Sequence, residues 1–244
     1  MTLIKKTPGR DRTPAQIAET RMRQWALDLE VEGRKGCQPA PDQLREVIHP
    51  CLTISRETGS EGAAIAQRVG EILSLEVLHR EILDFMAQRY GVDRGMLDFV
   101  DERTSDWFSE IFGKWINKRI VTQSEFIVQL GRIVLMAARH ASTVLVGRGA
   151  QFLLPREKTL AIYIVSPFEM RTKYVCESRK CSVAEAKRYI RDTDRERQDF
   201  VKMCFHRDMG DPHLYDLVIN RAYVGIEPAA EMIANQWRIR FGTG

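Results

Sequence analysis

A short apolar strand that runs directly into a glycine-containing turn and then into a helix constrains the fold more than any other feature of this chain. The strand covers residues 52–55, the turn covers 56–62, and the helix begins at Ala63. In such an arrangement the N–H groups of the turn and the dipole of the helix converge on one anion. Gly59 and Gly62 let the backbone approach that anion because they carry no side chain. We therefore expect a phosphate-binding turn.

The turn matches the full P-loop pattern only in part. If Gly62 is the last glycine of that pattern, Glu57 stands at the position of the first glycine. Ala63 then takes the place of the lysine, and Ala64 takes the place of the serine or threonine that binds Mg²⁺. The pattern by itself leaves a plain strand-to-helix connection open as the other interpretation.

The rest of the chain alternates strands with helices, which predicts an α/β fold with a parallel sheet flanked by helices. Further strands are expected at 75–78, 143–146, 160–165 and 216–220. Helices are expected at 63–73, 80–90, 94–103, 106–141, 182–206 and 227–240, and another opens at Ser166 and Pro167. Gly113 and Gly131 are the two places where the tract 106–141 could break.

Residues 1–45 form a separate segment of the sequence, ahead of a domain that spans residues 46–244. Thr13 and Gln16 have the spacing of a capping box, with Pro14 at the first helical position. We therefore expect an N-terminal helical extension with one apolar face. That face would dock either on the chain's own domain or on a partner subunit, which would make a homodimer.

The composition is that of a globular protein, with 44% hydrophobic and 29% charged residues among 244. The longest apolar runs are much shorter than the roughly 20 residues of a membrane helix. We therefore expect no membrane span and, by default, a cytoplasmic location. The five cysteines form no CxxC pair and are expected to be reduced thiols. A net charge of +4 suits phosphorylated small molecules, and it is small for a nucleic-acid-binding protein.

Four short stretches together form a more specific signal than the turn alone. They are residues 53–66, whose turn reads Ser-Arg-x-x-Gly-Ser-x-Gly, residues 145–150 after a strand, residues 193–197 in a charged helix, and residues 210–220. In this order and spacing they resemble the cytidylate-kinase-like family, a bacterial branch related to cytidylate kinases. The resemblance covers roughly residues 48–236.

This resemblance implies a three-layer α/β/α P-loop NTPase fold with a parallel sheet and a helical lid, and it implies that the first turn holds ATP, with Mg²⁺. The residues of that donor site would be Ser55, Arg56, Gly59, Ser60, Glu61, Gly62, Ala63 and Ala64. A phosphorylated acceptor, CMP by resemblance alone, would be held by residues that follow other strands or lie in the lid: His79, Arg80, Arg148 and Asp194. The catalytic residues would be Arg56, Arg148 and Arg197. Arg56 would hold donor phosphates, Arg148 the acceptor phosphate, and Arg197 would stabilise the transferring phosphoryl group.

Each of these assignments has an ordinary structural alternative. Arg148 could form a surface ion pair, and His79 could have a structural role at the end of a strand. Arg197 lies in a tract where cations and carboxylates alternate, so it could belong to a solvated helix face with i,i+4 pairs.

The sequence also departs from the family's pattern in ways that concern catalysis. The missing lysine removes a positive charge from the donor site, and Arg56 is the nearest substitute. The second strand ends in Leu78-His79-Arg80 where the family has Tyr-Asp-Lys, and Gln151 replaces an aspartate. The alternative to a kinase is therefore a nucleotide-binding or sensing module that has lost catalysis. A third hypothesis is an interaction subunit that uses its N-terminal helix and basic lid.

Overall fold

The computed structural model describes residues 13, 16–18, 20–21, 48–80, 121–147 and 149–242. Within these residues, five strands form one parallel sheet in the order β2-β3-β1-β4-β5. The strands are β1 (Cys51–Arg56), β2 (Glu76–His79), β3 (Thr143–Val146), β4 (Thr159–Val165) and β5 (Leu217–Asn220). The carboxyl ends of all five lie along one edge, where α/β sheets bind their ligands.

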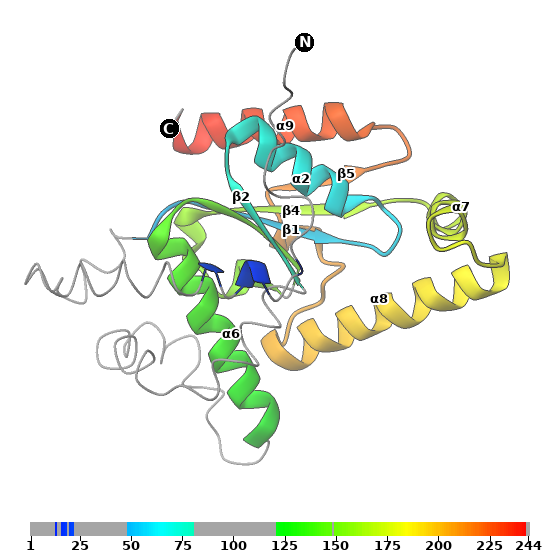
Figure 1. The fold of residues 1–244 in the computed structure, drawn as a ribbon, viewed down its shortest axis with the longest axis horizontal. Coiled ribbons are helices and arrows are strands. Elements are labelled where there is room, and N and C mark those ends of the chain that lie inside the picture. Colours follow the sequence, from blue (N-terminus) through cyan, green and yellow to red (C-terminus); the bar gives the residue numbers. More distant parts are fainter. Residues whose placement is uncertain are drawn as a thin grey trace, which may run out of the picture.

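Helices cover both faces of this sheet (Figure 1). On one face α2 (Gly62–Leu73) and α9 (Ile226–Phe241) lie side by side, and on the other lie α6 (Val121–His140) and α8 (Val183–Phe205). The helix α7 (Phe168–Arg179) stands beyond the sheet and packs against α8. Three short 3-10 helices lie in loops: η3 (Ala150–Phe152), η4 (Arg156–Lys158) and η5 (Pro212–Leu214). This is the three-layer α/β/α arrangement that the sequence predicts.

The central strand β1 separates two apolar cores. Leu52 and Ile54 face α2 and α9 and are buried with Ile65 and Val69 of α2. Cys51 faces the other side and is buried with residues of α6. Because both faces of a parallel sheet are covered, its strands read as nearly continuous apolar runs, which explains why they are recognisable in the sequence.

The strands and helices begin and end within one or two residues of the predicted positions. The helix α6 passes through Gly131 without a break, because Leu130 and Ile133 on either side are buried in the core. The helices predicted at 80–90 and 94–103, apart from Arg80, lie outside the described residues, as does the start of the tract 106–141.

The described part of the N-terminal extension packs on the sheet domain. Both hydrogen bonds of the predicted capping box are present, since the Thr13 N–H donates to Gln16 Oε1 at 2.9 Å and the Gln16 N–H donates to Thr13 Oγ1 at 3.3 Å. Ala18 is 0% exposed and shares a core with Cys51, and Arg21 pairs with Glu76 of β2. These contacts favour docking on the chain's own domain, while the domain boundary near residue 45 stays a prediction.

No helix in the described part of the chain is both long enough and apolar enough to cross a membrane.

Candidate active site

The turn between β1 and α2 offers several backbone donors to an anion. Glu61, directly before α2, has the left-handed conformation with φ of +58°, and Gly59 has φ of +82°. The N–H groups of Gly59, Glu61, Gly62 and Ala63 donate to no acceptor among the described residues. Unsatisfied N–H groups at a helix N-terminus form an anion site, so this geometry fits the phosphates of a nucleotide.

The two glycines of the turn are needed for contacts inside the protein itself. A Cβ atom on Gly59 would lie 2.9 Å from the carbonyl oxygen of Arg171, and one on Gly62 would lie 2.6 Å from the Cβ of Arg56. These separations are too short for a side chain. The glycines therefore serve the packing of the turn as well as the expected approach of a phosphate.

The first turn of α2 carries no group that would hold a metal ion. Ala63 and Ala64 are exposed and offer no side-chain oxygen. The Ser60 hydroxyl is buried and donates to the Glu57 carbonyl at 2.9 Å, while the Glu61 carboxylate accepts from Arg221 Nη2 at 2.5 Å. Among the described residues no cluster of three or more His, Cys, Asp or Glu side chains could bind a metal. These residues do not fit Mg²⁺ held by protein ligands.

A buried cation, Arg171 of α7, packs against the turn and binds its backbone. Its Nη1 donates to Asp194 Oδ2 at 2.5 Å and to the Thr58 carbonyl at 3.3 Å, and its Nε donates to the Ser166 carbonyl at 2.9 Å. The Thr58 N–H in turn donates to Asp194 Oδ1 at 2.8 Å. Glu57 completes the network, because its Oε2 accepts from the Ser166 N–H at 2.8 Å and lies 3.5 Å from Arg171 Nε.

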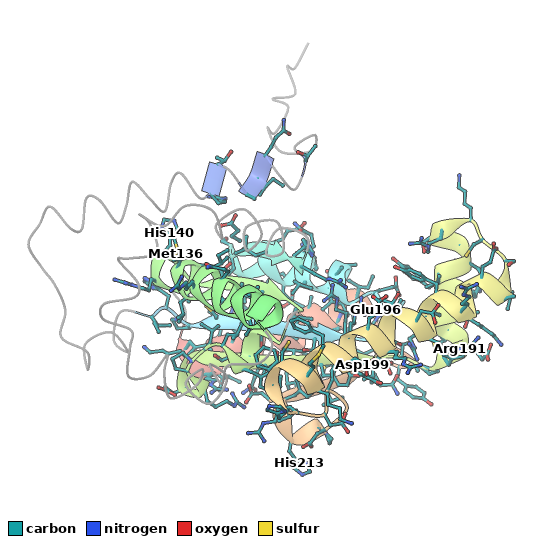
Figure 2. The ribbon with its side chains drawn as sticks, turned by 90° about the horizontal axis from the view of Figure 1, so that it is seen from below. Met136, His140, Arg191, Glu196, Asp199 and His213 are labelled. Atoms are coloured by element: carbon teal, nitrogen blue, oxygen red, sulfur yellow. The ribbon has the colours of Figure 1, made fainter. Side chains whose placement is uncertain are left out.

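A cavity of about 350 Å³ lies next to the turn, between the sheet and α8. Such a volume is within the usual range for small-molecule sites. On the sheet side it is lined by Ser55, Arg56, Gly147 and Gly149, which lie at or directly after the carboxyl ends of β1 and β3, and by Arg80 after β2. Residues of α8 and the loop after it complete the lining: Glu196, Arg197, Asp199, Phe200, Val201, Met203 and Met209. Figure 2 labels Glu196 and Asp199 along α8.

Three arginines converge on this cavity from three elements. The guanidinium of Arg56 lies over Gly147, where an added Cβ would fall 2.2 Å from Arg56 Nη1. Arg197 of α8 lines the same cavity, and its Nη1 donates to the Arg56 carbonyl at 3.0 Å. Arg80 follows β2. A cavity with several fixed guanidinium groups suits an anion such as a phosphate.

Two buried tyrosines, Tyr163 of β4 and Tyr215 directly before β5, have phenols that are neutral at physiological pH. Burial raises the pKa of Tyr215 to about 12, and burial, followed by the charge of Glu57, raises the pKa of Tyr163 further above its ordinary value. The rings stack with centroids 4.8 Å apart, and the Tyr215 hydroxyl donates to the Met209 carbonyl at 2.9 Å. The Tyr215 phenol is therefore a structural donor to the loop after α8.

The structure separates the predicted site residues into groups. Ser55, Arg56, Arg80 and Arg197 come together at the cavity. Residues Gly59 to Ala64 form the adjoining turn and the start of α2. Arg148 lies outside the described residues, although its neighbours Gly147 and Gly149 line the cavity.

Two predicted acceptor residues lie elsewhere. His79 ends β2 and is not among the residues that line the cavity. Asp194 binds the Thr58 N–H and Arg171. The sequence analysis did not identify Arg171 or Arg221, because neither residue stands in a motif. The available signal for Arg171 was its position, one turn into a helix that follows a strand.

Comparison with known proteins agrees with this geometry. The sequence model of the cytidylate kinase-like family matches residues 51–223. A cytidylate kinase of Methanopyrus kandleri is 26% identical over 174 residues, which are 71% of this chain and 85% of that protein. The crystal structure of an uncharacterized protein from Eubacterium ventriosum superposes with a TM-score of 0.63 at 21% identity, covering 77% of this chain and 97% of that one. The structural likeness concerns the fold alone.

Proposed function

Since this chain belongs to the cytidylate kinase-like family, we propose that it transfers the γ-phosphate of ATP to a phosphorylated small molecule, namely a nucleoside monophosphate such as CMP. The observation that carries this proposal is the cavity where Arg56, Arg80 and Arg197 meet beside the anion-binding turn. Phosphoryl transfer needs a donor and an acceptor side by side in a field that stabilises negative charge. The turn and the cavity offer these two places.

On the donor side the backbone would carry out most of the binding. The N–H groups of Gly59, Glu61, Gly62 and Ala63 lie in the turn and at the start of α2, and they would bind the phosphates of ATP. ATP supplies the phosphoryl group that is transferred. Mg²⁺ would reach the site only as part of the nucleotide complex, because the described residues of the turn provide no ligand for it.

On the acceptor side the charge comes from side chains. Arg80 would bind the phosphate of the acceptor, and Arg148 joins it by family resemblance. Arg56 and Arg197 lie where the turn meets the cavity, so their guanidinium groups would stabilise the charge that develops during transfer. Phe200, Met203 and Met209 give the cavity an apolar part that suits a flat base.

A nucleotide-binding module without catalysis is the second candidate, and one specific observation favours it. Neither Ala63 nor Ala64 provides the charge or the metal ligand that a P-loop normally has at the start of its helix. On this alternative the protein would bind ATP and not consume it.

The test is coupled ADP release by the purified protein with Mg-ATP and a panel of CMP, dCMP, UMP and other phosphorylated or hydroxylated acceptors. We expect ADP release that depends on the acceptor and is lost in Arg56→Ala. Arg188→Ala is the matched control, because Arg188 is an exposed cation of α8 paired with Asp192. No turnover with any acceptor, together with a rise in melting temperature on adding ATP, would establish the binding module instead.

A further inference from the structure

We propose that Asp194 and Arg171 are positioning residues for the donor turn, and that Asp194 does not contact the acceptor. Their buried ion pair fixes the backbone around Thr58 and so aims the N–H groups that follow it. This inference rests on the proposed function where it concerns ATP, and on the structure alone where it concerns the shape of the turn.

Both carboxylate oxygens of Asp194 are already bound to the protein. Oδ1 accepts from the Thr58 N–H at 2.8 Å and lies 3.7 Å from Arg197 Nη1, and Oδ2 accepts from Arg171 Nη1 at 2.5 Å. The side chain is 20% exposed and is absent from the lining of the cavity. An aspartate with both oxygens engaged in this way serves the turn and not a ligand in the cavity.

Arg171 holds the same peptide from its other side. Its Nη1 donates to the Thr58 carbonyl, so that the N–H of Thr58 binds Asp194 and the carbonyl of Thr58 binds Arg171. The side chain is only 9% exposed, and a cation this deeply buried must be paired. Gly59 then packs directly on the Arg171 carbonyl. Thr58, which precedes the anion-binding N–H groups, is therefore held at both its backbone N–H and its backbone carbonyl.

A third restraint acts on the turn beside this ion pair. Arg197 provides it, since it donates to the Arg56 carbonyl one turn of α8 beyond Asp194. Side chains of α7 and α8 thus hold the carbonyls of residues 56 and 58 and the N–H of Thr58. A displacement of about 1 Å in a phosphate site costs on the order of 100-fold in rate, so restraints of this kind have large effects on function.

The helix α8 provides a matched control for Asp194. Asp192 lies two residues earlier, is 64% exposed and pairs only with Arg188 of its own helix, at 3.5 Å. Asp192→Asn removes the same charge from the same helix and leaves the turn untouched. The double variant Asp194→Asn/Arg171→Gln removes both buried charges together, which avoids leaving Arg171 buried without a partner.

The experiment combines hydrogen exchange with separate titrations of ATP and CMP. In Asp194→Asn and in the double variant we expect faster amide exchange in the peptide that covers residues 55–62, an ATP affinity lower by about tenfold, and a CMP affinity within about twofold of the wild type. Asp192→Asn is expected to match the wild type in all three measurements.

Unchanged exchange in the turn would overturn the inference whether or not nucleotides bind. A loss of CMP affinity with ATP affinity preserved would also overturn it, because Asp194 would then contact the acceptor. If the wild type bound neither nucleotide, the proposed function would fail, and faster exchange in Asp194→Asn would still support the role of the ion pair in the turn.

Discussion

The proposed donor turn and the proposed acceptor cavity lie next to each other and use different kinds of binding group. The turn at residues 57–61 presents backbone N–H groups, and the side chains of Glu57 and Ser60 bond within the protein. The cavity presents side chains, with Arg56, Arg80 and Arg197 along its lining. A P-loop lysine would place a positive charge at the start of α2. In this chain Arg56, Arg80 and Arg197 place positive charge along the cavity instead.

This difference has a consequence for how the two substrates depend on particular residues. A site made of backbone groups depends on the shape of its turn, so it responds to substitutions that move the backbone. A site made of guanidinium groups depends on single side chains. Substitutions in the two regions are therefore expected to change different kinetic constants.

Removing the cation at the junction should have the largest effect on activity. Arg197→Ala deletes a guanidinium that lines the cavity and donates to the Arg56 carbonyl. We expect kcat/KM to fall by about 100- to 1,000-fold, because charge on the transferring group loses a fixed donor. Coupled ADP release measures it, with Arg191→Ala on the exposed side of α8 as the control. A loss of less than about threefold would mean that Arg197 supports the Arg56 carbonyl and does not act on the transferring group.

A substitution that only strains the donor turn comes next. Gly59→Ala places a side chain at φ of +82° and 2.9 Å from the Arg171 carbonyl. We expect the free energy of unfolding to fall by about 1–3 kcal/mol and the affinity for ATP to fall with it. Urea unfolding and ATP titration measure the two effects. If the affinity for the acceptor fell as well, the two regions would not be independent.

An ion cluster at the amino ends of β4 and β5, formed by Asp216, Arg156 and Arg240, tests whether such effects are local. Burial by itself would raise the pKa of Asp216. Hydrogen bonds from Arg156 and from the Ala161 N–H, together with the charge of Arg240, have a larger effect and hold this pKa below its usual range. The ionised form is favoured by folding, so its stabilisation is complete above the unfolded pKa of about 4 and is lost as the pH falls through the lower folded pKa.

Asp216→Asn should therefore lower the free energy of unfolding at pH 7 by about 2 kcal/mol. The difference from the wild type should shrink as the pH falls below about 4. Urea unfolding between pH 7 and pH 2.5 measures this trend, and KM values at pH 7 should stay unchanged. A difference that grows on acidification would mean that folding raises the pKa of Asp216 instead of lowering it.

Restoring the missing lysine should have the smallest effect. Ala63 is exposed at the second position of α2, so Ala63→Lys fits without a clash. We expect KM for ATP to fall by roughly two- to fivefold, because an exposed charge contributes about 1 kcal/mol or less. Initial-rate kinetics with varied ATP measure it, with Gln67→Lys one turn along the same helix as the control. A fall in KM for the acceptor instead would place the donor phosphates elsewhere.

The fold was predictable because local and global signals agree. Strands such as Thr143–Val146 are buried on both faces and read as apolar runs, and the capping box at Thr13 marks where a helix begins. The turn after β1 was predictable for the same reason, since its glycines leave a visible pattern.

The site was predictable where a residue stands in a recognisable stretch or, as Arg80 does, directly follows a predicted strand. Arg56 and Arg197 belong to recognisable stretches, and both line the cavity. The contact between Arg171 and Asp194 joins residues on two helices, and a sequence pattern does not show which cation a carboxylate will meet. The family resemblance assigns Asp194 to the acceptor, and the structure adds its contacts with the Thr58 N–H and with Arg171.

Calorimetric titration of Arg80→Gln with ATP and with CMP, in separate experiments, tests the division between the two regions most directly. Arg80 lines the cavity and follows β2, away from the turn. The affinity for CMP should fall by about tenfold or more, as expected for one hydrogen bond to a charged group, and the affinity for ATP should stay the same. An unchanged affinity for CMP together with weaker binding of ATP would contradict the assignment of the cavity to the acceptor.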